Sequence, residues 1–106
     1  MIRHCVFIRF RADVGNATKL SIYQEIADLK RTMPGIIAVY EGENVSPETG
    51  MDKGFSDGFI VDFVDEAARD TYLADPDHQK TGAKIVAAAE GGLAGIFVYD
   101  LKLPSA

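Results

Sequence analysis

The segment IRHCVFIRFR, residues 2–11, is rich in β-branched and aromatic residues and alternates along its length. A period of two predicts a β-strand, because successive side chains of a strand point to opposite faces of its sheet. The even-numbered face consists of Ile2, His4, Val6, Ile8 and Phe10. We expect this face to lie against helices, and the odd-numbered face to form the other side of the sheet.

The residues that follow this strand change to a helical period. Thr18 to Met33 carries apolar residues at helical spacing, which predicts a helix with one buried stripe. Pro34 and Gly35 end this helix, because proline cannot continue the hydrogen-bond ladder and glycine accepts a left-handed conformation.

The remainder of the chain adds three strands and two helices. The predicted elements are a strand at 36–46, a polar loop at 47–54, a strand at 55–64, a short helix that begins at 65 and stops before Pro76, a helix at 76–89 and a strand at 93–101. This β-α-β-β-α-α-β order predicts the α+β class and a ferredoxin-like split βαβ plan, a four-stranded antiparallel sheet with helices on one face. At 106 residues the chain has the size of one domain, so we predict a single domain over 1–106.

Charge and composition argue against several classes of partner. The net charge is -5 and the eleven Lys and Arg residues are scattered, so we expect binding to neither nucleic acid nor an anionic membrane surface. No segment approaches 18 uninterrupted apolar residues, which predicts no membrane span. Arginines interrupt the first apolar stretch, so we expect no secretory signal and a cytoplasmic location.

The second face of the predicted sheet is also apolar. It carries Cys5 and Phe7 in the first strand and Ile60 and Val64 in the third, and residues 96–99 leave neither face of the last strand polar. An apolar sheet face is normally covered, and the chain has no further helix to cover it. We therefore predict a homodimer that contacts itself through this face, with Cys5 and Phe7 in the interface.

Three polar side chains are candidates for a catalytic site. His4 lies on the strand face predicted to meet the helices, Tyr72 lies in the short helix, and His78 lies in the first turn of the last helix, so the three can converge on one cavity. The positive end of the helix dipole favours a neutral His78, which suits a general base, whereas Asp75 and Asp77 favour the imidazolium.

Each of these residues also has a purely structural interpretation. A histidine on a buried strand is commonly a hydrogen-bonded core residue, a tyrosine can simply bury its ring, and His78 can bond a backbone carbonyl at the start of a helix. Tyr72 and His78 lie outside the predicted core stripe, so we expect alanine at either position to leave the fold intact.

The expected lining of the cavity is apolar and consists of Val6, Ile8, Phe59, Val61 and Ile26. Asp57 shares the core face of its strand, which is unusual for a carboxylate, and we assign it to substrate binding. With His4 and His78 it would form a two-histidine, one-carboxylate set, but the spacing has no metal signature, so we expect neither a metal nor an organic cofactor. The expected ligand is a small, largely apolar molecule with a carbonyl or phenolic oxygen.

Several segments are similar to one known family. The opening Ile2–Phe10, the Pro34-Gly35 entry to the second strand, the cluster Tyr72–His78 and the ending Phe97–Asp100 resemble the stress-responsive A/B-barrel (Dabb) family over nearly the whole chain. The resemblance implies a ferredoxin-like domain that dimerises through its sheets into an α+β barrel.

Most members of that family have no established reaction, and the best-understood one is olivetolic acid cyclase, a cofactor-free enzyme that closes a polyketide by aldol condensation. The resemblance implies that its strand histidine, helix tyrosine and helix-start histidine correspond to His4, Tyr72 and His78. A further cavity histidine corresponds to Asp57, which changes the charge and the hydrogen bonding of the pocket.

Two classes of function follow from these observations. The first is a small-molecule-binding protein or a cyclase- or lyase-like enzyme, with His78 as base and with Tyr72 and His4 orienting the ligand. The second is a non-catalytic, stress-associated dimer, and the related antibiotic-biosynthesis monooxygenases offer a further enzyme type. An open apolar pocket around His78 would favour the first class, and a closed, packed interior would favour the second.

Overall fold

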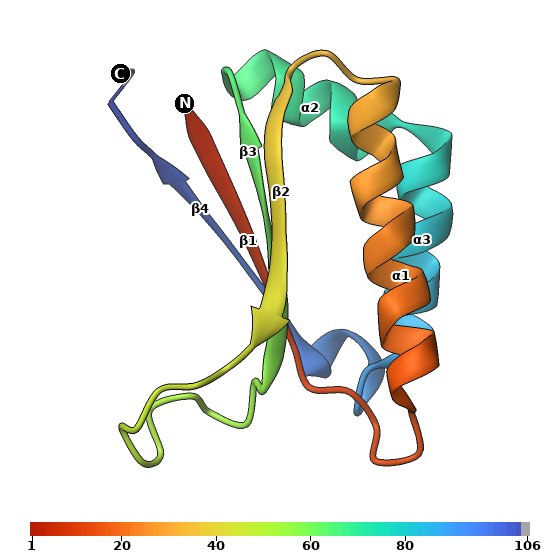
Figure 1. The fold of residues 1–106 in the computed structure, drawn as a ribbon, viewed down its shortest axis with the longest axis vertical. Coiled ribbons are helices and arrows are strands. Elements are labelled where there is room, and N and C mark those ends of the chain that lie inside the picture. The colour runs from red at the N-terminus through yellow and green to blue at the C-terminus, as the bar shows by residue number, and fades with distance from the viewer. Residues whose placement is uncertain (105–106) are drawn as a thin grey trace.

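The computed structural model describes residues 1–104 and has two layers, a sheet and a layer of helices that covers one of its faces (Figure 1). The elements in chain order are β1 (Ile2–Ile8), α1 (Asn16–Asp28), the 3-10 helix η1 (Leu29–Arg31), β2 (Ile36–Glu43), β3 (Asp57–Phe63), α2 (Glu66–Ala74), α3 (Pro76–Ala88), the 3-10 helix η2 (Gly92–Gly95) and β4 (Ile96–Lys102). The strand order is β2-β3-β1-β4 and every neighbouring pair is antiparallel. The predicted class, element order and sheet are confirmed.

Two strands are shorter than predicted because the backbone groups at their ends form hydrogen bonds outside the sheet ladder or belong to a 3-10 helix. β1 ends at Ile8, since the backbone of Arg9 turns to Gly95 and Glu90, with hydrogen bonds of 2.8 and 2.7 Å. β4 begins at Ile96 rather than at residue 93, because 92–95 form η2. Gly95 is needed there, since a Cβ at this position would overlap the carbonyl oxygen of Glu90.

Aspartate caps fix where the two C-terminal helices begin. The Asp65 carboxylate accepts a hydrogen bond from the backbone N–H of Ala68 at 2.9 Å, and α2 starts at the next residue. The Asp75 carboxylate accepts from the backbone N–H of His78 at 3.0 Å, and Pro76 occupies the first position of α3. Such caps satisfy amide groups that would otherwise lack partners at a helix start, so local sequence places His78 in the first turn.

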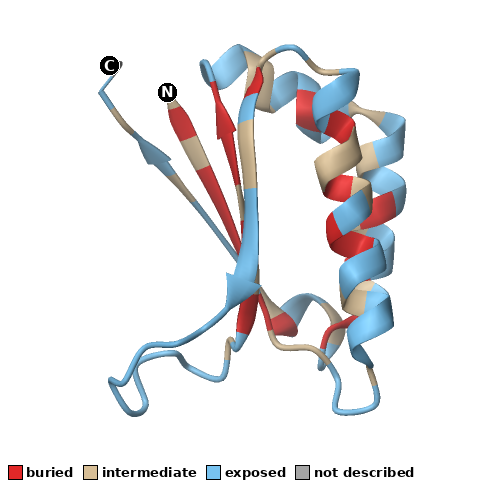
Figure 2. Cartoon of the chain, in the orientation of Figure 1, coloured by how far each residue is buried: buried red, intermediate tan, exposed pale blue. Residues whose placement is uncertain are grey.

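The core lies between the sheet and the helices, and the edge strands β2 and β4 are largely exposed (Figure 2). The largest fully buried side chains are Tyr72, Phe63, Ile8, Ile26 and Val61. The premise that Tyr72 lies outside the core is therefore wrong, because the phenol ring has no exposed surface and packs within the hydrophobic core. Tyr72→Ala is consequently expected to destabilise the fold.

The second face of the sheet is apolar, as predicted, with Phe7 37% exposed and Phe97 46% exposed. Their rings stack with a centroid distance of 6.3 Å. Arg3 and Asp62 form a bidentate ion pair on the same face, with N–O distances of 2.9 and 3.0 Å. We call this face, which no helix covers, the outer face (Figure 1).

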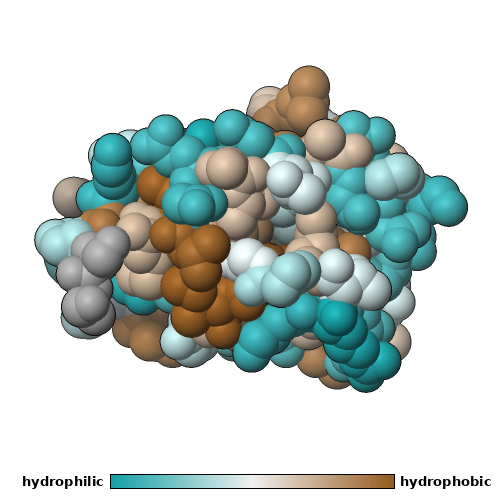
Figure 3. All heavy atoms as spheres, turned by 90° about the horizontal axis from the view of Figure 1, so that it is seen from above, coloured by the Kyte–Doolittle hydropathy of each residue, from teal (hydrophilic) through white to brown (hydrophobic). Residues whose placement is uncertain are grey.

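The loop of residues 44–56 projects from the end of the sheet on the side away from the helices (Figure 1). At the opposite end, where the chain termini lie, hydrophobic side chains are exposed among hydrophilic ones (Figure 3). None of the helices within residues 1–104 is both long and apolar enough to cross a membrane.

Candidate functional site

Tyr72 contacts both histidines at one end of the core. Its ring centroid lies 5.9 Å from that of His4 and 4.0 Å from that of His78. Phe63 packs edge-on against Tyr72 at 5.0 Å and against His4 at 6.2 Å. The structure thus brings together the three residues that the sequence singled out, one from β1, one from α2 and one from α3.

Two polar atoms in this cluster are buried without a hydrogen-bond partner among residues 1–104: Oη of Tyr72 and Nδ1 of His78. An unsatisfied buried polar group costs about 1–3 kcal/mol, and the polar group of a ligand can remove that cost. The buried hydroxyl of Tyr23 is also unpartnered, but it stands alone, whereas Tyr72 and His78 offer two such atoms on rings in contact. A donor and an acceptor on neighbouring rings are a suitable pair for binding one small polar group.

The environment of His78 favours the neutral imidazole. Burial lowers the pKa of His78, and repulsion from the positive charge that His4 carries when protonated lowers it further. The Leu73 carbonyl and Asp75 act in the opposite direction without reversing the shift. Near pH 7 the ring therefore holds a free nitrogen lone pair that can accept a proton.

The lowered pKa of His78 predicts a pH-dependent stability. Below about pH 6.5 the histidine of the unfolded chain takes up a proton that the folded protein resists, so the free energy of unfolding falls as the pH falls. We expect the wild type to lose more stability between pH 7.5 and 5.5 than His78→Gln in urea unfolding. Parallel losses in the two proteins would show that the pKa of His78 is not lowered.

His4 has a partner that the sequence analysis did not identify. Its Nδ1 lies 2.6 Å from Oδ1 of Asp100 on β4, and Oδ2 of Asp100 accepts a hydrogen bond from Nη1 of Arg69 at 2.8 Å. The only signal in the sequence was that Asp100 alternates with Val98 on the helix-facing side of β4. The register that places Asp100 opposite His4 comes from the strand pairing.

Asp57 does not join this cluster. It pairs with Ile8, four residues along β1 from His4, so the two residues lie about 13 Å apart along the sheet. Its buried carboxylate accepts hydrogen bonds from Lys19 Nζ at 3.3 Å and Ser56 Oγ at 2.9 Å. Within the described chain, no three His, Cys, Asp or Glu side chains are grouped as metal ligands.

The apolar residues expected to line the cavity pack against one another in the hydrophobic core: Val6, Ile8, Phe59, Val61 and Ile26. Val61 lies directly opposite His4, whereas Phe59 and Ile8 lie farther toward Asp57. The apolar body of a ligand would therefore have to displace or rearrange part of this packing.

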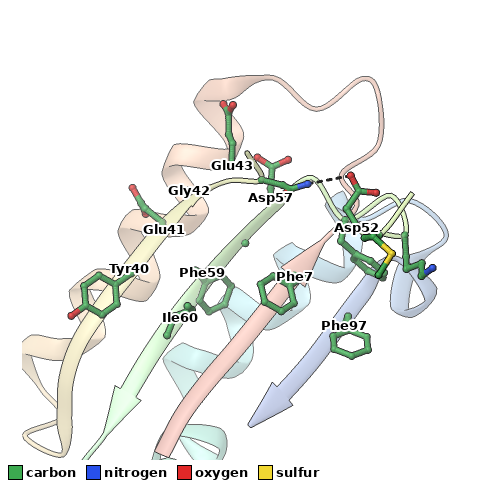
Figure 4. A pocket seen from close by; sticks show the side chains of 15 residues that line it. Phe7, Tyr40, Glu41, Gly42, Glu43, Asp52, Asp57, Phe59, Ile60 and Phe97 are labelled. Atoms are coloured by element: carbon green, nitrogen blue, oxygen red, sulfur yellow. Dashed lines mark hydrogen bonds between the residues drawn. The ribbon is translucent and has the colours of Figure 1, made fainter. Parts of the chain in front are cut away.

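Two open hollows of about 510 Å³ each lie elsewhere on the molecule. The first is on the outer face near the 44–56 loop, with walls from Phe7, Phe55 and Phe97 and with Gly42 and Gly58 paired across β2 and β3 (Figure 4). The second lies between α1 and α3 and is lined by residues that include Ser21, Glu25 and Lys84. His4, Tyr72 and His78 line neither hollow.

Solved structures share this architecture. A dimeric ferredoxin-like protein of unknown function from Jannaschia sp. CCS1 is 27% identical, with 96% of this chain and 98% of that chain covered and a TM-score of 0.89. A hydroxynitrile lyase from Passiflora edulis is 18% identical, with 99% and 94% covered and a TM-score of 0.82. A dimeric ferredoxin-like protein from Thermobifida fusca YX is 19% identical, with 96% and 90% covered and a TM-score of 0.75.

No functionally curated protein matches the chain in sequence. The family model of the stress responsive A/B barrel domain, Dabb, matches residues 2–103, which include every strand and helix described above. The chain therefore belongs to the stress responsive A/B barrel domain family.

Proposed function

We propose that the protein is a homodimer that binds a small, largely apolar molecule through a carbonyl or phenolic oxygen at Tyr72 and His78, and that it acts on this molecule as a lyase- or cyclase-like enzyme. The observation that carries the proposal is the pair of buried, unpartnered atoms, Tyr72 Oη and His78 Nδ1. They lie beside an imidazole whose Nδ1 is already held by Asp100. A ligand oxygen would satisfy polar groups that the ligand-free protein leaves unsatisfied.

The three side chains suit proton transfer at a carbonyl compound. Burial raises the pKa of Tyr72, so its hydroxyl stays protonated and can donate a hydrogen bond to the ligand's carbonyl oxygen. In a cleavage reaction neutral His78 can take the proton of a hydroxyl; the O–H electron pair then forms the C=O bond while the adjacent C–C bond breaks, and the departing carbanion takes up the proton from the imidazolium. In an aldol reaction His78 can take a proton from an acidic C–H bond; the resulting carbanion attacks a carbonyl carbon, whose oxygen becomes an alkoxide that is then protonated. The similarity in fold to a hydroxynitrile lyase supports a lyase reaction. The related aldol chemistry depends only on the correspondence of His4, Tyr72 and His78 with cyclase residues that the family resemblance implies.

The homodimer is supported by the composition of the outer face. Stacked aromatic rings, among them Phe7, Phe97 and Tyr99, are exposed on a face that no helix covers. Two of the solved structures with this fold are described as dimeric. A second copy would bury this surface and would exclude water from the Arg3–Asp62 ion pair.

Binding is best tested with benzaldehyde as an aromatic carbonyl probe and resorcinol as a phenolic probe, by isothermal titration calorimetry. We expect wild-type binding of at least one probe, and about five- to tenfold losses in Tyr72→Phe and His78→Gln, because each removes one net hydrogen bond of about 1–1.5 kcal/mol. The matched control is Tyr23→Phe, since Tyr23 is also a buried tyrosine with an unpartnered hydroxyl but contacts Phe10 and Phe59 instead. Unchanged affinity in the two site variants would contradict the proposal.

A second candidate function is a non-catalytic, stress-associated dimer. The observation that favours it is the one that the sequence analysis named as the discriminator: the interior beside His78 is packed, with the ring of Tyr72 fully buried, and the two open hollows lie away from it. Under this alternative neither probe binds, and Tyr72→Phe changes stability alone.

A further inference from the structure

Both carboxylate oxygens of Asp100 are engaged, each by a different element of the fold. Oδ1 lies 2.6 Å from Nδ1 of His4 on β1, and Oδ2 accepts from Nη1 of Arg69 on α2 at 2.8 Å. Arg69 also donates from Nε to Asp70 at 2.9 Å, and that carboxylate is 67% exposed. The guanidinium thus connects the solvent-facing side of α2 with the buried ring of His4.

Asp100 needs such a restraint because of where it lies. It projects from the helix-facing side of β4, an edge strand that the helices leave largely uncovered (Figure 2). A carboxylate there can rotate into water, and the hydrogen bond to His4 alone would have to resist this rotation. Arg69 reaches it from α2, three residues before Tyr72, so one helix positions both the phenol and the carboxylate of the site.

We propose that Arg69 is a positioning residue, which fixes the Asp100 carboxylate and thereby keeps a proton on Nδ1 of His4 whenever that ring is in its neutral form. In a neutral imidazole one nitrogen donates and the other accepts, so a proton held on Nδ1 leaves Nε2 as the lone-pair nitrogen available to a ligand. This role rests on the function proposed above, because it matters only if His4 orients a ligand. In enzymes with a histidine base, a carboxylate hydrogen-bonded to the imidazole selects its tautomer and its orientation. We assign this role to Asp100 for His4, with Arg69 holding Asp100 in place.

The charges around Asp100 are consistent with this role. Burial acts to raise the pKa of Asp100, but hydrogen bonds from Arg69 and His4 outweigh it and hold the pKa below its usual range. The charged groups that face this carboxylate are Arg69 from α2 and, when protonated, His4 from β1, while Asp70 contacts only Arg69. Asp100 thus stays ionised, and remains an acceptor for Nδ1–H, far below neutral pH.

The test is an NMR comparison of wild type, Arg69→Gln and Asp70→Asn without any ligand. The chain has two histidines, so a spectrum of His78→Gln assigns the His4 resonances. In the wild type, ¹⁵N shifts should show the proton on Nδ1 of His4. In Arg69→Gln we expect solvent exchange of that proton to become about tenfold faster, because Asp100 loses the charge-assisted hydrogen bond that holds it against His4. The carboxyl carbon of Asp100 should also titrate at a higher pH.

Asp70→Asn is the matched control, since it removes the other partner of Arg69 and should leave His4 unchanged. If Arg69→Gln lowers the melting temperature without altering the tautomer, the exchange rate or the Asp100 titration, Arg69 is merely structural and the inference is wrong. Should that variant fail to give a folded spectrum, Arg69→Met, which keeps an apolar stem without the charge, is expected to show the same faster exchange. None of these measurements uses a ligand, so they can fail independently of the proposed function.

Discussion

Tyr72→Ala is expected to lower the free energy of unfolding by about 3–5 kcal/mol, the range for truncating a fully buried aromatic side chain. The ring contacts Phe63, His4 and His78. Its removal deletes these contacts and leaves a cavity between the three side chains. Urea unfolding at pH 7.5 measures the effect. Leu73→Ala is the control, because the neighbouring leucine on the same helix is largely exposed and should cost far less.

Tyr72→Phe is expected to act in the opposite direction. The ring and its packing remain, while a buried hydroxyl without a partner in the described chain is removed, so the ligand-free protein should gain about 1 kcal/mol. If Tyr72→Phe raises the free energy of unfolding and weakens probe binding, the Tyr72 hydroxyl serves binding and lowers the stability of the ligand-free protein. A clear loss of stability would instead mean that the hydroxyl is satisfied, for example by an ordered water, and the strongest support for the site would be gone.

Phe97→Asp is expected to dissociate the proposed homodimer. Phe97 lies on the outer face beside Phe7, Phe55 and Tyr99, with 46% of its surface exposed in the single chain. An isologous interface contains each residue twice, so the substitution would bury two unpaired carboxylates. At several kcal/mol for each unpaired charge, the dissociation constant should rise about a thousandfold or more.

Sedimentation velocity at micromolar concentration distinguishes the outcomes. The wild type should sediment as a dimer and Phe97→Asp as a monomer with an unchanged circular dichroism spectrum. Leu20→Asp is the control, because Leu20 is 61% exposed but lies on α1, away from the outer face, and this variant should remain a dimer. A monomeric wild type, or a dimer that survives Phe97→Asp, would show that a second copy does not cover the outer face.

The sequence by itself determined the order and type of the elements, and the buried faces of the strand at 2–11 and of the helix at 18–33. The two-residue period of 2–11 and the helical period of 18–33 depend only on neighbouring residues, and so do the caps at Asp65 and Asp75. Such local rules act before any tertiary contact forms, which is why they can be applied to the sequence alone. They also placed the two histidines and Tyr72 on elements that meet at one end of the core.

Only the tertiary structure decided the composition of the site. Asp100 meets His4 across 96 residues of chain, and Arg69 meets Asp100 across 31, because the register of β4 on β1 and the position of α2 set these pairs. The same register places Asp57 at the far end of the sheet. The burial of Tyr72 was missed for the same reason: a short helix shows little periodicity, and what covers its ring is decided by how helices and sheet pack in three dimensions.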